Sequence, residues 1–376
     1  MKVNSHLFPT TYEGSRQRFR QNLDRVREFW QDAALNRQVY DETEDLSTDW
    51  IQAEALERPE KVFILTTGEH GIEGYVGSAM LQRFIEKFMH RLDPLSTGLV
   101  LVHAINPWGM VHRRRTNANN VDLNRNFVWD AGMIDPSFNP EHKSIDLIVN
   151  PKKPVDSYWG SLLSFMVQLS RYSITMGFQD FKKTSLLGHY RNPEGIHYGG
   201  DSYQGETKTL MHLYRKSFLP YDQILHVDMH TGYGPRYQMS LVNSVYEKGN
   251  SQRFSKRFNY PKVVAANTDE FYNLRGDMID YVYTLWKNEF PEKRLYSCSF
   301  EFGCYGSSVG SMIRAMLAMT LENQAYWYGT ANGVIQARIE HNFLEAFYPR
   351  SETWREKAVA DADQAFEGIL KAEGYI

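Results

Sequence analysis

The chain has 376 residues, 42% of them hydrophobic, and a formal net charge of −3 at pH 7. This length and composition predict a globular protein with enough material for a sizeable core. The near-neutral charge excludes the strongly basic surface that attracts nucleic acids and anionic membranes, so we expect small molecules or peptides as partners.

The sequence shows no sign of a targeting signal, a membrane span or a disulfide framework. Its first residues form no apolar run of signal-peptide length, and no stretch of about eighteen apolar residues occurs anywhere. The two cysteines, Cys298 and Cys304, are too few to form a disulfide framework. We therefore expect a cytoplasmic protein whose oligomeric state the sequence leaves open.

Hydrophobic periodicity predicts the elements in chain order. Apolar residues at helical spacing predict an amphipathic helix at about 14–36, inside an N-terminal helical segment of about 10–40. A continuous apolar run at 61–68 predicts a buried strand, and a helix at about 74–92 and a second buried strand at 98–106 follow it. This order of strand, helix and strand predicts a parallel βαβ unit.

The second half of the chain continues the alternation. We predict strands at 223–230, 239–245, 261–267 and 296–302, and helices at 276–289, 308–328 and 351–372. The segment 130–222 contains repeated prolines and the pair Gly199 and Gly200, and we interpret it as an irregular insertion around a cleft. The prediction is one α/β catalytic domain over 1–376, with a mostly parallel mixed sheet and helices on both faces.

Two polar motifs follow predicted strands, at the sheet edge where ligands collect. Gly-Glu-His-Gly-Ile-Glu-Gly at 68–74 carries His70 and Glu73, and His-Val-Asp-Met-His-Thr-Gly at 226–232 carries His230. Catalytic zinc takes three ligands of the His and Glu type and keeps one position open for water. The sequence therefore indicates a metal site made of these three residues.

A second histidine competes for the ligand position, and a glutamate remains for catalysis. His226 shares a predicted strand face with Asp228 and His230, so periodicity does not choose between the two histidines. The position of His230 at the strand end favours it. Glu301 ends another predicted strand among apolar neighbours. Because burial of a carboxylate without a function is costly, we interpret Glu301 as a catalytic base.

The polar segment 115–127 has too few aliphatic residues to be core. Arg115 could polarise a scissile carbonyl as a fixed cation. Asn124 and Arg125 would suit a substrate carboxylate, because a guanidinium presents a planar fork of donors and the amide adds another. The alternative interpretation is a solvated basic loop.

An aromatic cluster lies in the predicted insertion beside a glycine pair. Its members are Tyr190, His197, Tyr198 and Tyr203. The cluster predicts either a lid or specificity wall over the cleft, or the packing of an irregular surface loop. The sequence leaves both interpretations open.

Taken in order, these motifs resemble the zinc metallocarboxypeptidase superfamily, which includes carboxypeptidases and deacylases of the succinylglutamate desuccinylase and aspartoacylase type. The resemblance rests on His70-x-x-Glu73, Arg115-x-Asn117, Val121-Asp-Leu-Asn-Arg-Asn-Phe127, Asp228-x-His230 and Glu301-Phe-Gly303. An N-terminal Tyr12-x-x-x-Arg16-x-x-Phe19 pattern is similar to a bacterial branch of that superfamily. The likeness spans about 12–125 and 224–325.

The resemblance implies one zinc ion per chain, held by His70, Glu73 and His230. It implies hydrolysis of an amide bond beside a free carboxylate, in which zinc lowers the pKa of its bound water and Glu301 accepts the proton. Arg115 would then stabilise the oxyanion. Cobalt, nickel or manganese also suit such ligands, so the sequence leaves open both the native metal and a second metal ion.

By the same resemblance, Asn124 and Arg125 would anchor the substrate carboxylate, and the mobile tyrosine of the superfamily would be Tyr272, Tyr281 or Tyr283. We expect a metallocarboxypeptidase that acts on small peptides. An N-acyl amino acid deacylase, which uses the same metal site and anchor, is the second hypothesis. A non-catalytic binding protein on the same scaffold is the third.

Overall fold

The computed structural model describes residues 5–265 and 274–376, and an eight-stranded mixed sheet lies at its centre. The strands are β1 (Ala34–Asp41), β2 (Leu46–Ala53), β3 (Lys61–Thr67), β4 (Thr97–His103), β5 (Gln223–Gly232), β6 (Met239–Asn243), β7 (Val263–Val264) and β8 (Arg294–Gly303). They lie in the order β1-β2-β4-β3-β5-β8-β6-β7. The central strands β4, β3, β5 and β8 are parallel, whereas β2 is antiparallel to β4 and β6 to β8. The predicted fold class is confirmed.

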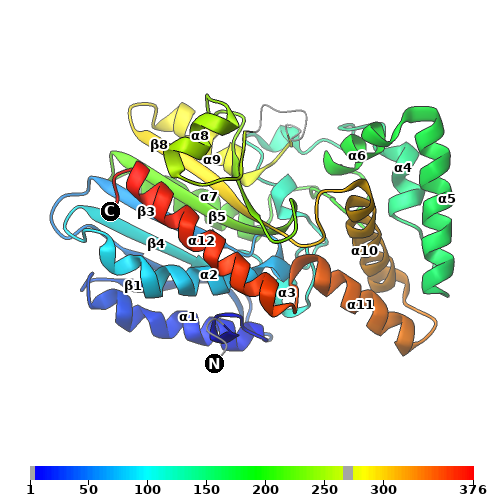
Figure 1. The fold of residues 1–376 in the computed structure, drawn as a ribbon, viewed down its shortest axis with the longest axis horizontal. Helices are drawn as coiled ribbons and strands as arrows, with labels where there is room; N and C mark the ends of the chain where they lie inside the picture. The colour runs from blue at the N-terminus through cyan, green and yellow to red at the C-terminus, as the bar shows by residue number, and fades with distance from the viewer. Residues whose placement is uncertain (1–4, 266–273) are drawn as a thin grey trace.

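Helices cover both faces of this sheet (Figure 1). They are α1 (Tyr12–Arg27), α2 (Gly74–Lys87), α3 (Pro107–Val111), α4 (His142–Val149), α5 (Tyr158–Met176), α6 (Phe178–Leu186), α7 (Gly205–Phe218), α8 (Ser251–Phe258), α9 (Met278–Glu289), α10 (Val309–Tyr328), α11 (Gly333–Phe347) and α12 (Glu352–Ala372). Helices α1, α2, α8 and α12 share one hydrophobic cluster with the sheet, and α7 and α9 share another. A third cluster joins α4, α5, α6 and α10 beside the sheet.

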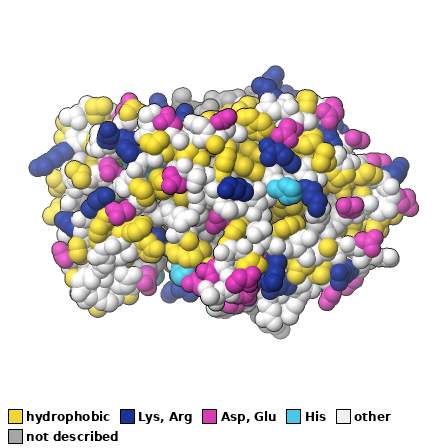
Figure 2. All heavy atoms as spheres, turned by 180° about the vertical axis from the view of Figure 1, so that it is seen from behind, with side chains coloured by type: hydrophobic (Ala, Val, Ile, Leu, Met, Phe, Trp, Pro, Cys, Tyr) yellow, Lys and Arg dark blue, Asp and Glu magenta, His cyan; other side chains and the backbone are white. Residues whose placement is uncertain are grey.

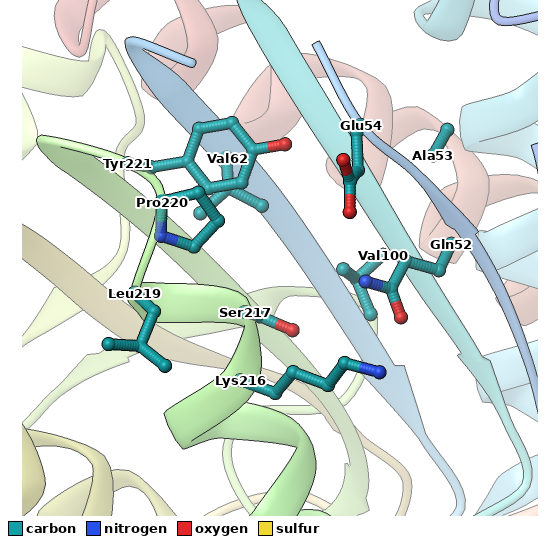
Figure 3. Close-up of a pocket in the computed structure, with 10 residues that line it drawn as sticks. All are labelled: Gln52, Ala53, Glu54, Val62, Val100, Lys216, Ser217, Leu219, Pro220 and Tyr221. Atoms are coloured by element: carbon teal, nitrogen blue, oxygen red, sulfur yellow. The ribbon is translucent and has the colours of Figure 1, made fainter. Parts of the chain in front are cut away.

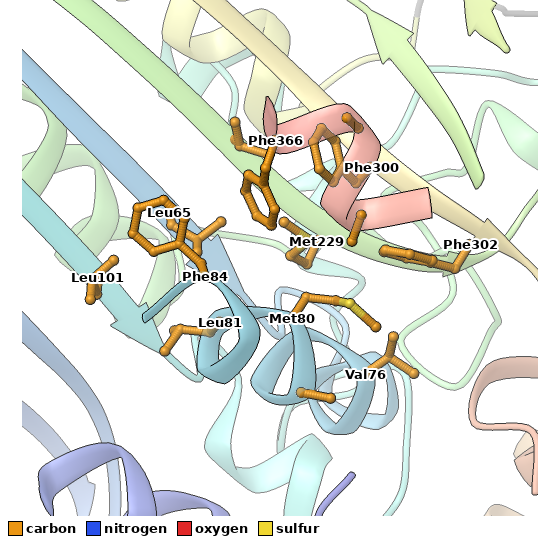
Figure 4. Packing of buried hydrophobic residues seen from close by; sticks show 14 of the residues in the cluster. Leu65, Val76, Met80, Leu81, Phe84, Leu101, Met229, Phe300, Phe302 and Phe366 are labelled. Atoms are coloured by element: carbon orange, nitrogen blue, oxygen red, sulfur yellow. The ribbon is translucent and has the colours of Figure 1, made fainter. Parts of the chain in front are cut away.

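Strand β3 shows why a central strand can carry consecutive apolar residues. Successive side chains of a strand point to opposite faces. Leu65 packs with Phe84 of α2 and Phe366 of α12 on one face (Figure 4). Val62 and Ile64 belong to the cluster on the other face. Because both faces are covered, apolar side chains are favoured at both sets of positions.

The surface carries both signs of charge. In Figure 2, acidic and basic side chains are interspersed on the face shown, with hydrophobic side chains between them. A mixture of this kind provides no extended basic field on that face. Among the described residues, no helix is both long and apolar enough to cross a membrane.

The predicted N-terminal helix is too long. Helix α1 ends at Arg27, before the end of both the predicted helix at 14–36 and the predicted helical segment at 10–40. Strand β1 begins inside both predicted ranges and forms an antiparallel hairpin with β2. Trp30 lies beyond the helix, and its indole nitrogen donates to the carbonyl of Thr97 at 2.8 Å. Strand β1 is a largely polar edge strand, so it lacks the apolar alternation that would have identified it.

The insertion over 130–222 is not irregular, because it contains α4, α5, α6 and α7. Its prolines lie between these helices, as Pro151 and Pro154 do between α4 and α5. Proline ends helices, so the prolines marked helix boundaries and not an absence of helices. Helix α11 was also absent from the prediction. Strand β7 covers part of the predicted strand 261–267, whose residues after 265 lie outside the described residues.

A close backbone approach fixes the loop after β3. A Cβ atom on Gly71 would lie 2.0 Å from the carbonyl carbon of Gly109 in α3. We therefore expect Gly71→Ala to lower the free energy of unfolding by about 2 kcal/mol or more, because the added atom overpacks a backbone contact. Gly333→Ala is the matched control, since nothing lies within 4 Å of its Cβ position. Thermal unfolding of both variants tests this, and equal melting temperatures would contradict it.

Candidate metal centre and catalytic cavity

The structure brings all seven predicted site residues to one cavity at the carboxyl ends of the central strands. His70 and Glu73 lie in the loop after β3, where Gly71–Glu73 forms one turn of 3-10 helix. His230 lies near the end of β5 and is paired in register with Glu301 of β8. With Arg115, Asn124 and Arg125, these residues line a cavity of about 410 Å³.

Two histidines turn the same ring nitrogen toward one carboxylate. The Nδ1 atom of His70 lies 3.0 Å from Glu73 Oε1, and the Nδ1 atom of His230 lies 3.2 Å from Glu73 Oε2. All three side chains are buried. Burial opposes ionisation of Glu73, but the two histidines outweigh it and lower the pKa of this carboxyl. Two nitrogens and a carboxylate therefore converge on one point.

Carboxylates also hold the opposite nitrogen of each ring. The Nε2 atom of His70 lies 3.0 Å from Asp122 Oδ1, and the Nε2 atom of His230 lies 2.6 Å from Asp228 Oδ2. Metal-binding histidines commonly present this second nitrogen to a carboxylate, which orients the ring. Burial lowers the pKa of His230, but Asp228, Glu73 and Glu301 outweigh it and raise it well above its usual range. The Nδ1 atom of His230 thus remains on the Glu73 side of the ring, where it could contact a metal cation.

Glu69 is a second buried carboxylate at this centre, and the sequence analysis missed it. Its Oε2 atom lies 3.4 Å from His230 Nε2, and neither of its oxygens has a hydrogen-bond partner among the described residues. Burial raises its pKa well above the usual range. Ligand atoms of Glu69, His70 and His230 lie within 4.8 Å of one another, so this group could also hold a metal ion. Glu69 faces the Nε2 side of His230, whereas Glu73 faces both Nδ1 atoms.

The competing histidine, His226, belongs to a hydrogen-bonded network behind the cavity. Its Nε2 atom lies 2.9 Å from Thr66 Oγ1 and its Nδ1 atom 2.8 Å from Ser297 Oγ. Thr66 in turn donates to Asp228 Oδ1 at 2.6 Å. Burial lowers the pKa of His226 to about 4, so it is neutral at pH 7. This network joins the core to His230 through Asp228.

Arg115 is fixed beside the histidine pair by Asp122. Its Nη1 atom donates to Asp122 Oδ2 at 2.6 Å, and its Nη2 atom lies 2.6 Å from His70 Nε2. Burial alone would raise the pKa of Asp122, but Arg115 and Arg125 outweigh it and hold it well below its usual range. The guanidinium is therefore a fixed positive charge at the cavity wall.

Glu301 has a free oxygen at the cavity. No hydrogen-bond partner of its Oε2 atom is found among the described residues. Burial raises the pKa of Glu301 to about 8, with a further contribution from Glu73, while His230 and Arg115 oppose the rise. A cation at the neighbouring centre would lower this pKa again, because it favours the charged form.

The predicted carboxylate anchors are largely engaged. The Asn124 amide donates to Asp277 Oδ2 at 3.1 Å, and its Oδ1 atom accepts from the amide of Met278 at 2.9 Å. Arg125 donates from Nη1 to the Asn124 carbonyl at 2.7 Å and from Nη2 to the Leu186 carbonyl at 2.6 Å. Only its Nε atom has no partner within the described ranges. Asn124 therefore ties this loop to the start of α9.

The aromatic cluster of the insertion is divided between packing and the cavity. His197 lines the cavity, and its Nδ1 atom lies 2.9 Å from the Ser185 carbonyl oxygen. Burial lowers the pKa of His197 to about 3, and Arg115 and Arg125 add to this effect, so the ring is neutral. Its backbone has φ +56°, a left-handed conformation that is uncommon for histidine. The three tyrosines of the cluster do not line the cavity, contrary to the interpretation of the cluster as a specificity wall.

Neither described candidate for the mobile tyrosine lines the cavity. Tyr281 and Tyr283 are buried, and the hydroxyl of Tyr283 donates to Glu247 at 2.6 Å. Tyr272 lies outside the described residues. The cavity is instead lined by Tyr233 and Tyr305, which the sequence did not single out.

A second cavity lies near the amino ends of β3 and β5, at the opposite edge of the sheet (Figure 3). Its volume is about 290 Å³. Glu54 and Lys216 are the charged residues among its lining, and no histidine joins them. It therefore lacks a set of metal ligands.

The model of the family described as "Protein of unknown function (DUF2817)" matches residues 8–361, so the chain belongs to this family. No curated protein matches the chain.

Solved structures to which this chain is similar include the following three proteins. Bovine thrombin-activatable fibrinolysis inhibitor is 13% identical, with 90% of this chain and 99% of that chain covered and a TM-score of 0.47. Carboxypeptidase A from Helicoverpa armigera is 13% identical, with 88% and 73% covered and a TM-score of 0.44. An aspartoacylase family protein from Mesorhizobium loti is 15% identical, with 80% and 68% covered and a TM-score of 0.37.

We expect Glu73 and Glu69 to contribute differently to metal binding. Because Glu73 faces both Nδ1 atoms, we expect Glu73→Gln to weaken zinc binding at least about 100-fold, and Glu69→Gln, which changes a neighbour of the Nε2 side, about 10-fold or less. Competition with a chromogenic chelator measures both affinities. His212→Ala, an exposed histidine on α7, is the control and should bind as the wild type does. A larger loss in Glu69→Gln would assign the ligand position to Glu69.

Proposed function

We propose that this member of the DUF2817 family is a metal-dependent hydrolase that cleaves an amide bond beside a free carboxylate, as a carboxypeptidase of small peptides. The observation that carries this proposal is the convergence of two histidine Nδ1 atoms on Glu73, next to an unpartnered oxygen of Glu301. Both lie in a cavity of about 410 Å³, a size that suits a small ligand.

His70, Glu73 and His230 would hold the metal ion, and zinc is the ion that such a ligand set most often takes. The donor set fits a cation, because the rings are oriented from behind by Asp122 and Asp228. When bound, the ion would act as a Lewis acid and lower the pKa of a water molecule toward about 7.

The protein's own groups would carry the proton and the charge. Glu301 would accept a proton from the attacking water and pass it to the leaving amine. Arg115, held by Asp122, would stabilise the negative charge on the carbonyl oxygen without moving. The free Nε–H of Arg125 would donate to the substrate carboxylate, and Asn124 would support it by holding this loop on α9.

The second candidate function is an N-acyl amino acid deacylase. The same catalytic groups serve both reactions, and part of the cavity wall is apolar. Helix α10 contributes four apolar residues to the lining: Met312, Ala315, Met316 and Met319. An apolar wall of this kind could close the acyl side around a short acyl group.

A substrate panel separates the two candidates. N-blocked dipeptides and N-acyl amino acids would be compared by kcat/KM with the zinc-loaded protein. A preference for dipeptides supports the carboxypeptidase, and a preference for short N-acyl amino acids supports the deacylase. If the loaded protein cleaves no member of either series, the proposal fails.

Removal of the base should separate catalysis from metal binding. We expect Glu301→Gln to lower kcat about 10²- to 10⁴-fold, because general-base catalysis is lost while the amide preserves the shape of the side chain. The zinc content should stay at the wild-type level, since Glu301 is not one of the proposed ligands. Metal analysis and kinetics on the same preparation test this. A variant that keeps wild-type turnover would exclude Glu301 as the base.

The pH dependence follows from the same carboxyl. Glu301 must be ionised to accept a proton, so we expect kcat/KM to fall as the pH drops through its pKa. The pKa is about 8 without a cation, and a bound cation lowers it, so the acidic limb should lie below pH 8. A pH–rate profile of the loaded enzyme measures this limb. A profile that rises only above pH 8 would contradict the assignment.

A further inference from the structure

Helix α5 has an outer face that the fold leaves uncovered. The described part of the chain has eighteen exposed large hydrophobic residues, and six of them lie on this one helix: Trp159, Leu163, Met166, Val167, Ile174 and Met176. Ile174 is 84% exposed and Leu163 is 65% exposed. Soluble proteins rarely expose apolar side chains in such a concentration unless the surface binds something.

Five of these residues form a straight stripe. Trp159, Leu163, Met166, Val167 and Ile174 recur at helical spacing, with the small residue Ser170 between the last two. The opposite face of α5 is buried, because Phe165, Leu169 and Tyr172 pack into the third hydrophobic cluster. Helix α5 is therefore apolar on both faces, and such helices are normally covered on both.

The charge of α5 identifies the kind of partner. Arg171 is its single charged residue among nineteen. A helix that binds an anionic membrane surface carries a strongly basic polar face, which is missing here. A neutral apolar stripe is complementary to another neutral apolar stripe, and a second copy of this chain supplies one.

The stripe is also complementary to itself in size. In an antiparallel pair with a two-fold axis between Met166 and Val167, Trp159 would face the partner subunit's Ile174, and Leu163 would face the partner's Ser170. The stripe would be about 22 Å long at about 1.5 Å per residue. Leu163 then packs over the small side chain of the partner's Ser170, as close packing of helices requires.

The position of α5 permits this contact. In Figure 1, α5 is the outermost helix at one end of the molecule, beyond α4 and α6. Two copies could therefore meet end to end without a collision between their sheets. None of the five stripe residues lines the catalytic cavity.

We infer that this chain forms a homodimer through the antiparallel pairing of two α5 helices along the stripe of Trp159, Leu163, Met166, Val167 and Ile174. The inference is independent of the proposed function, since it uses no residue of the candidate site.

Light scattering after gel filtration tests the dimer on the full chain. The wild type should have twice the chain mass of 43.8 kDa at micromolar concentration, and Leu163→Glu should halve it. Leu219→Glu is the matched control, because Leu219 is also 65% exposed but lies at the end of α7. It should keep the doubled mass. A wild type of single mass, or a Leu163→Glu dimer, would overturn the inference.

A second measurement avoids the risk that the charged variant fails to fold. Val167→Cys, close to the axis, should cross-link to its copy with a short bis-maleimide, whereas Trp159→Cys, at the end of the stripe, should not. The native Cys298 and Cys304 are buried and should not react. Cross-linking at Trp159→Cys but not at Val167→Cys would exclude the antiparallel pairing.

Discussion

The parallel register between β5 and β8 is the constraint on which the candidate site depends. It pairs His230 with Glu301 at the carboxyl ends of the two strands. A shift of β8 by one residue would turn Glu301 to the face of the sheet opposite His230, because successive residues alternate. The same register sets His226 opposite Ser297 and Asp228 opposite Ser299, so the network that orients His230 arises from the same pairing.

The loop after β3, which carries His70 and Glu73, is positioned by the same sheet. Strand β3 pairs with β5 through Thr67 and Met229, which brings the following loop over the end of β5. The loop is then held from outside, since the amides of Gly71 and Ile72 donate to the carbonyls of Arg115 and Arg114. The segment that carries Arg115 thus supports the loop that carries His70 and Glu73. Two segments distant in the sequence are positioned as one unit.

A cation would stabilise the buried carboxyl groups of this region. Five buried or half-buried carboxyl groups meet there, whose members are Glu69, Glu73, Asp122, Asp228 and Glu301. Arg115 and Arg125 supply two fixed positive charges. Burial raises the pKa values of Glu69 and Glu301, and neighbouring carboxylates raise that of His230, so the protonated form of each group is favoured. Because buried charge is costly unless paired, a cation that replaces these protons would stabilise the centre.

Much of this site could be predicted from the sequence because its residues follow apolar strands directly. The run that ends before His70 is long and apolar, and Glu301 ends a strand among apolar neighbours. The position of both strand ends at the sheet edge follows from parallel topology. The β1–β2 hairpin could not be predicted in this way, since a polar edge strand has no apolar period. Glu69 was overlooked because its role depends on which side of His230 it faces, and spacing alone does not contain that information.

The contacts of the predicted carboxylate anchor could not be predicted from the sequence either. From the sequence, Asn124 and Arg125 appeared equivalent as donors, yet Asn124 gives its amide to Asp277. A substrate carboxylate beside Asp277 would meet a like charge, which is unfavourable. Under the proposed function, the carboxylate is therefore better placed toward Arg125, which leaves Arg115 for the carbonyl oxygen.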